Sequence, residues 1–247
     1  MQGGTRGGPQ CSRNCTALRR LMFRIAIASI ALMCLADSAS AQTRPGLPLV
    51  QQAITDTARA RVDYAFQLEH VFGGESFRAL FAPGGQPRVR LIAPANRDGL
   101  SEQLRTDFDY IAQHTEGVPW CANEILAHIR DVRLVREDAA VAVYSFQPTA
   151  QSVTGEQTRQ VVNHLRGEIT IDKARRDVSH LRLFAPRPFR PYPIARVDVY
   201  TITTACALAP NGRYYVSEQT RQVRSNAFGR SFNIDVVRRN RVLASPQ

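Results

Sequence analysis

A repeated alternation of apolar and polar residues, interrupted at short intervals by turn residues, constrains this chain most. In residues 62–71, Val62, Tyr64, Phe66 and Leu68 fall at every second position, which predicts a strand with one buried face. Similar segments between glycine, proline and asparagine turns predict strands at 76–82, 88–93, 131–136, 140–146, 161–172, 178–185, 194–208, 213–224 and 230–237. Short hairpin connections require antiparallel pairing, and a sheet of this size tends to curl and bury one face.

Three segments have helical periodicity instead: residues 49–60, residues 100–114 and a short turn at 123–129. In the second segment, Leu104, Phe108 and Ile111 share one helical face. The expected fold is therefore α+β and mainly antiparallel β. It is a curled sheet or half-barrel of about ten strands, with two or three helices over its open side.

The first 41 residues have the pattern of a secretory signal peptide. A basic region precedes an apolar run at 25–35, and small residues end the segment at Ala41. Cleavage between Ala41 and Gln42 is expected, and it would deliver the chain to the periplasm; an uncleaved anchor is the alternative. Because Met22 directly precedes the apolar run, residues 1–21 could be an upstream extension.

The remaining chain is long enough for one domain with its own hydrophobic core and short for two. We expect a short proline-containing arm at 42–48 and a single β-rich domain at 49–238. The basic tail at 239–247 is expected to be frayed.

Two cysteines remain after the expected cleavage, Cys121 and Cys206. In an oxidising compartment this number predicts a single disulfide. Two separately buried thiols are the alternative.

The formal net charge is +11, and Lys173 is the only lysine, so nearly all of the positive charge is arginine. A GC-rich genome would explain this preference. The other interpretation is a surface for anions, since guanidinium pairs bidentately with phosphate and carboxylate. For an exported protein, the available anions are lipid head groups, lipopolysaccharide and cell-wall polymers rather than nucleic acid.

An arginine–aromatic segment at 183–196 is the candidate for contact with such an anion. Basic and aromatic side chains alternate there among prolines: Arg187, Phe189, Arg190, Tyr192 and Arg196. Proline has no N–H donor, so this segment is not expected to be a central strand. A rigid loop that covers the sheet edge or the mouth of a cavity is the alternative. Nucleic-acid binding, which uses similar side chains, is not expected of an exported protein.

The hexapeptide EQTRQV occurs twice, at residues 156–161 and 218–223. The similarity extends only to Ile171-Asp172 and Ile234-Asp235, without the neighbouring turns, so it does not indicate a duplicated domain. Polar residues alternate in each copy before an apolar segment begins. This predicts a solvated strand end in both places; a ligand motif used twice is the other interpretation.

Sequence signatures of catalysis are absent. The chain has no nucleophile elbow, zinc-protease motif or phosphate-binding loop. No His-x-His or Cys-x-x-Cys pair occurs after the signal region, so neither a metal nor a cofactor is expected. A non-enzymatic protein is the prediction, and a hydrolase with a triad assembled from distant residues is the alternative.

Two strand–turn–strand segments resemble a known family. Residues 166–172 read Arg-Gly-Glu-Ile-Thr-Ile-Asp and precede a strand at 178–184, and a later hairpin turns at 211–213. With the signal peptide and the long antiparallel meander, they resemble the LolA/LolB-like lipoprotein-carrier superfamily over most of residues 49–237. The chain also resembles exported bacterial proteins with a Pro-Phe-Arg-Pro loop. The paired cysteines and the proline-rich loop depart from the LolA/LolB pattern, and the binding positions of that family have no match here.

The resemblance implies an open curved sheet whose apolar concave face, covered by helices, holds acyl chains. We therefore expect an envelope protein that binds an apolar or amphiphilic ligand and could contact the membrane peripherally. The candidate lining residues are Tyr64, Phe66, Leu68, Tyr200 and Ile202. The alternative is an interaction module with a filled interior that recognises an anionic envelope partner through its arginine segment.

Overall fold

The computed structural model describes residues 47–246. The predicted signal peptide, its cleavage site at Ala41–Gln42 and most of the arm lie outside these residues. Residues 47–246 belong to one compact unit. Among residues 47–246, no helix has the length and apolar character needed to cross a membrane.

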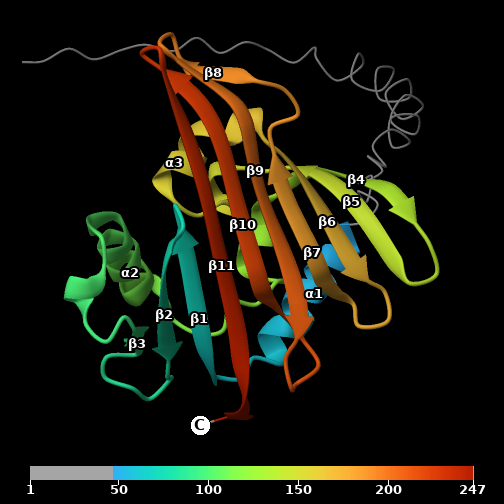
Figure 1. Ribbon diagram of the computed structural model, residues 1–247. Coiled ribbons are helices and arrows are strands. Elements are labelled where there is room, and N and C mark those ends of the chain that lie inside the picture. Colours follow the sequence, from blue (N-terminus) through green and yellow to red (C-terminus); the bar gives the residue numbers. More distant parts are fainter. Residues whose placement is uncertain (1–46, 247) are drawn as a thin grey trace, which may run out of the picture. The chain divides into compact units, whose positions relative to one another are not determined.

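One antiparallel sheet of eleven strands dominates the fold (Figure 1). Its strands are β1 Tyr64–Phe72, β2 Glu75–Phe81, β3 Val89–Ala93, β4 Arg130–Glu137, β5 Val141–Gln147, β6 Arg166–Asp172, β7 Asp177–Phe184, β8 Phe189–Tyr192, β9 Ala195–Leu208, β10 Tyr214–Ala227 and β11 Arg230–Pro246. The spatial order is β3-β2-β1-β11-β10-β9-β7-β6-β5-β4, and the short β8 pairs with β9 beside this path. Because β3 and β4 are unpaired ends, the sheet is curled but open, as predicted. The proline-rich segment forms β8 and not a central strand, which the missing N–H donors also predicted.

The last strand is longer than expected and joins the two halves of the sheet. β11 pairs with β1 on one side and with β10 on the other. The frayed tail expected at 239–247 is therefore wrong for residues 239–246. The alternation simply continues there: Asn240 is buried, while Arg239 lies on the outer face and forms ion pairs with Glu69 at 3.0 Å and Glu218 at 2.8 Å. The segment was predicted to be a frayed tail because arginines on the outer face give this strand a basic, polar composition.

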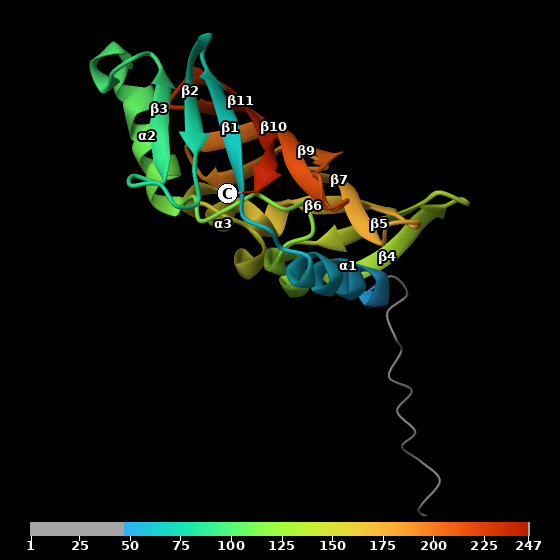
Figure 2. The ribbon, with the colours of Figure 1, turned by 90° about the horizontal axis from the view of Figure 1, so that it is seen from below.

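The helices lie on one face of the sheet (Figure 2). They are α1 Leu47–Arg59, α2 Glu102–His114 and α3 Glu156–Val161, with short 3₁₀ segments η1 Arg97–Gly99, η2 Glu124–His128, η3 Ala150–Ser152 and η4 Val162–His164. α1 packs against β7, and α2 packs against β2 and β3 through the predicted face of Leu104, Phe108 and Ile111. Asn123 caps η2, because its side chain accepts a hydrogen bond from the Ile125 N–H.

The two EQTRQV copies adopt different secondary structures, so the strand prediction is correct for only one of them. Residues 218–223 lie within β10, but the first copy is the helix α3. In α3, Thr158 and Val161 are buried three residues apart on one helical face, and the Thr158 and Tyr200 hydroxyls lie 2.8 Å apart. In β10, the same six residue types pair through backbone hydrogen bonds with β9 and β11. Tertiary context overrides the weak local propensity of this polar segment.

Two separate hydrophobic cores cover the concave face. One lies between α1, η2 and strands β5 to β7, and the other lies between α2 and strands β1 to β3. A third, smaller cluster joins α3 to β8 and β9. The inner side chains of β9, β10 and β11 lie between these clusters, and they form the floor of the site described next.

Candidate ligand-binding cavity

A cavity of about 330 Å³ occupies the concave face between the two large cores. This volume lies in the range of small-molecule binding sites. Strands β7, β9, β10 and β11 form its floor, and residues of α2, η2 and the segment 152–155 form its sides. The space between sheet and helices, for which the sequence left open and filled alternatives, is thus open.

One side of the cavity is apolar. Its wall consists of Ile125, Leu126, Phe146, Leu181, Leu183 and Ile202. Gly167 shapes this wall, because it is the register partner of Phe146 and a Cβ at this position would overlap the Phe146 ring. The glycine thereby lets the ring lie across β6 and reach the cavity.

Four polar residues form a row across the floor. His70 on β1 is the register partner of Arg238 on β11, Arg238 pairs with Gln219 on β10, and Gln219 pairs with Thr204 on β9. Directly paired residues point to the same face of a sheet. All four line the cavity, so a polar band crosses four adjacent strands.

Arg221 and Arg238 bring two like charges to this cavity. Arg238 pairs with Gln219 and Arg221 with Val236, so the two arginines are diagonal neighbours on adjacent strands. Within residues 47–246, neither arginine forms a salt bridge, and Arg238 Nε is buried without a hydrogen-bond partner. Burial, and then the charge of Arg221, lower the pKa of Arg238, as expected for a cation without a close counter-ion.

On the outer face of the same strands, an arginine is paired with carboxylates. A hollow of about 390 Å³ lies there, lined in part by Glu69 and Arg239. Arg239 is bonded to both Glu69 and Glu218. This outer arginine therefore has two carboxylate partners, whereas Arg221 and Arg238 have none among the described residues.

His70 and Asp107 form a hydrogen-bonded pair at the α2 side of the cavity. Nε2 of His70 lies 3.0 Å from Oδ2 of Asp107, and the His70 side chain is only 4% exposed. Burial is the largest influence on this imidazole and lowers the pKa of His70, against the raising effect of Asp107. In the neutral form, Nε2 donates to the carboxylate, which leaves Nδ1 as a buried acceptor without a partner among the described residues.

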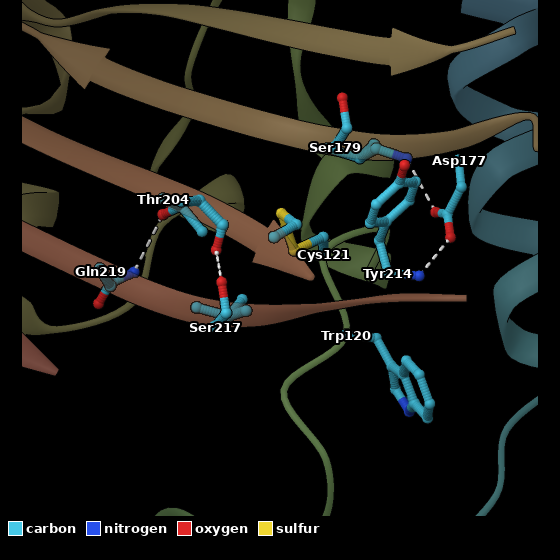
Figure 3. The surroundings of a disulfide bond; sticks show 12 residues. Trp120, Cys121, Asp177, Ser179, Thr204, Tyr214, Ser217 and Gln219 are labelled. Atoms are coloured by element: carbon cyan, nitrogen blue, oxygen red, sulfur yellow. Dashed lines mark hydrogen bonds between the residues drawn. A yellow bond between two sulfur atoms is a disulfide. The ribbon is translucent and has the colours of Figure 1, made fainter. Parts of the chain in front are cut away.

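The predicted disulfide between Cys121 and Cys206 is present, with a Cα–Cα distance of 6.4 Å. It joins the segment after α2 to β9 beside the cavity, between the Thr204–Gln219 pair and the Asp177–Tyr214 contact (Figure 3). The Cys121 N–H also donates to the Tyr214 carbonyl at 3.0 Å. The disulfide thus fixes the segment that leads into η2, which forms one side of the cavity.

Only one of the five predicted lining residues reaches the cavity. Ile202 belongs to the apolar wall. Tyr64, Phe66 and Leu68 point inward as predicted, but they pack within the core under α2. Tyr200 belongs to the cluster under α3.

The arginine–aromatic segment lies away from the cavity. Phe189 is buried and stacks on His164, with ring centroids 4.3 Å apart. The other four residues are exposed: Arg187, Arg190, Tyr192 and Arg196. Arg196 pairs with Asp198 on the same strand at 2.6 Å, so part of its charge is already balanced.

Sequence reasoning missed His70, Asp107, Arg221 and Arg238. The sequence did contain one indication of Arg221 and Arg238. Each occupies an inward position of a predicted strand or of its continuation, where a charged residue is unusual. Their proximity depends on the pairing of β11 with β1 and β10, which the sequence did not reveal. Within the described residues, no group of three or more potential metal ligands comes together.

No protein-family model matches the sequence, and neither does any curated protein. Among solved structures, the crystal structure of MucB in complex with MucA(peri) is 10% identical, with a TM-score of 0.22 over 78% of this chain and 93% of that chain. The MucA/MucB complex of Pseudomonas aeruginosa is also 10% identical, with a TM-score of 0.23 over 80% and 99% of the two chains.

Proposed function

We propose that this chain is an exported, non-enzymatic envelope protein that binds an amphiphilic ligand, such as a lipid or a lipoprotein acyl chain, in the cavity. The supporting observation is the cavity itself, which lies between two separate cores and has a continuous apolar wall. A module with a filled interior, the alternative, would have side chains in the place of this cavity.

The arrangement of the sheet supports the same proposal. An open curled sheet with its α-helices on one face is what the resemblance to the LolA/LolB-like superfamily implies, and we propose membership of that superfamily. Export is tested separately, by N-terminal sequencing of protein recovered from the periplasmic fraction. Gln42 as the first residue is the expected result, and a cytoplasmic protein that retains residue 1 or 22 would refute it.

Ligand binding is tested with the purified protein. Organic extraction followed by mass spectrometry should release a bound lipid, and an apolar fluorescent probe should bind the emptied protein. Ile202→Trp places a larger side chain in the cavity next to the apolar wall and should abolish probe binding. Val199→Trp is the matched control, because Val199 lies on the same strand but is exposed on the outer face.

Two results would refute the proposal. One is a protein that yields no lipid and takes up no probe. The other is equal probe binding by the wild type and a folded Ile202→Trp variant.

A further inference from the structure

The polar side of the cavity contains more positive than negative charge. Its charged lining residues are Arg221, Arg238 and Asp107. Burial lowers the pKa of His70, which favours the neutral imidazole, and Asp107 is hydrogen-bonded to it. Two guanidinium groups therefore share a partly buried space with one carboxylate, so a single negative charge would balance the site. A buried charge without a partner is costly, which favours an anion at this position.

The cationic and apolar parts of the floor are adjacent. Arg221 on β10 is the register partner of Ile202 on β9, and Ile202 is in turn the register partner of Leu183 on β7. All three side chains line the cavity. One molecule can therefore contact the arginines and the apolar wall together.

We propose that the ligand is an amphiphile with an acidic headgroup, whose carboxylate or phosphate binds between Arg221 and Arg238 while its hydrocarbon part lies against Leu183 and Ile202. This inference rests on the proposed function and adds the charge and orientation of the ligand. Guanidinium donates two parallel N–H groups to a carboxylate or phosphate, and such charge-assisted bonds are about twice as strong as neutral ones. Gln219 and Thr204, next in the polar row, offer neutral hydrogen bonds to the same headgroup.

The test compares ligands that share one chain and differ in the headgroup. Dodecanoate, dodecyl phosphate and dodecanol compete with the neutral fluorescent probe N-phenylnaphthylamine, and inorganic phosphate tests the headgroup alone. We expect the two acidic amphiphiles to bind at least about tenfold more tightly than dodecanol. This advantage should shrink as salt is added.

Arg221→Gln and Arg238→Gln test the two arginines separately. Each should weaken dodecanoate binding by about tenfold or more and leave dodecanol binding unchanged. Arg241→Gln is the control, because Arg241 is exposed on the outer face of β11 and does not line the cavity. Arg221→Gln and Arg238→Gln each remove the repulsion between these two like charges, so thermal unfolding of either variant should show no loss of stability.

The wild-type comparison of headgroups decides the inference even if a variant does not fold. Equal affinity for dodecanoate and dodecanol would refute the preference for an acidic headgroup and leave the proposed function intact. If inorganic phosphate bound as tightly as dodecyl phosphate, the inference that the ligand is an amphiphile would be refuted, since the site would then recognise a free anion. Failure of the probe and of every chain to bind would overturn the proposed function as well.

Discussion

The carboxylate of Asp177 has no exposed surface and lies 3.1 Å from Nε of Arg213. Its two oxygens also accept hydrogen bonds from the N–H groups of Val178 and Tyr214, each at 2.8 Å. Arg213 Nη2 in turn donates to the Thr57 hydroxyl of α1 at 2.7 Å. One ion pair therefore links β7, the β9–β10 hairpin and the first helix.

Asp177→Ala should lower the free energy of unfolding by about 3–5 kcal/mol, because it leaves a largely buried guanidinium without its counter-ion and two backbone N–H donors without an acceptor. Urea denaturation measures the change. Glu137→Ala breaks the more exposed pair with Lys173 and should cost less than about 1 kcal/mol. Equal effects of the two substitutions would show that the Asp177 pair does not hold these elements together.

Replacing Cys121 and Cys206 together with alanine should destabilise the protein by about 2–5 kcal/mol, since the disulfide closes a loop across 85 positions of sequence. The same variant should bind the apolar probe less tightly, because the side of the cavity that contains η2 loses its attachment to β9. Denaturation and probe titration in the presence and absence of a reductant measure both effects. A reductant that changes wild-type stability but not probe binding would separate the disulfide from the cavity.

Stability should fall as the pH drops below 6.5, and His70 should be responsible. Its folded-state pKa is lowered, so the unfolded chain takes up a proton that the folded chain resists, with a slope of up to about 1.4 kcal/mol per pH unit. Asp107 on α2 and the charges of Arg238 and Arg221 face this imidazole. His70→Gln should flatten the decline between pH 6.5 and the onset of carboxylate titration.

The control for this measurement is His128→Gln, which changes an exposed histidine and should keep the wild-type slope. An unchanged slope in His70→Gln would assign the pH dependence to another group.

Gly167→Ala should cost about 1–3 kcal/mol and reduce the affinity for the apolar probe, because the new methyl group must displace the Phe146 ring. Phe146→Leu should partly rescue the stability of this variant. Gly117→Ala is the control, since a Cβ there would meet only the Asp63 carboxylate at an ordinary 3.7 Å. A wild-type probe affinity in Gly167→Ala would show that the ring does not shape the cavity.

Local patterns predicted the sheet, the principal helices and the inward direction of Tyr64 and Phe66, because alternation and helical periodicity depend on neighbouring residues alone. They did not predict the secondary structure of the first EQTRQV copy, which contains few apolar residues and takes its conformation from packing against Tyr200.

The candidate site was largely beyond sequence reasoning for a related reason. His70 and Arg238 are 168 positions apart, and they meet only through the register of β1 against β11. The cysteine count did predict the disulfide, because two cysteines allow only one pairing. The arginine composition drew attention to anions, but the exposed segment at 183–196 was more conspicuous than two isolated arginines inside strands.

The position of β11 has a consequence for how the molecule assembles. β1, near the start of the described residues, has β2 as a neighbour but lacks its second neighbour until the last strand is added. Pairing of β1 with β11 must therefore wait for contacts between segments that are far apart in the sequence, which are slow to form. A growing polypeptide cannot complete the sheet before β11 has been made, and the cavity, whose floor includes β11, cannot take shape before then.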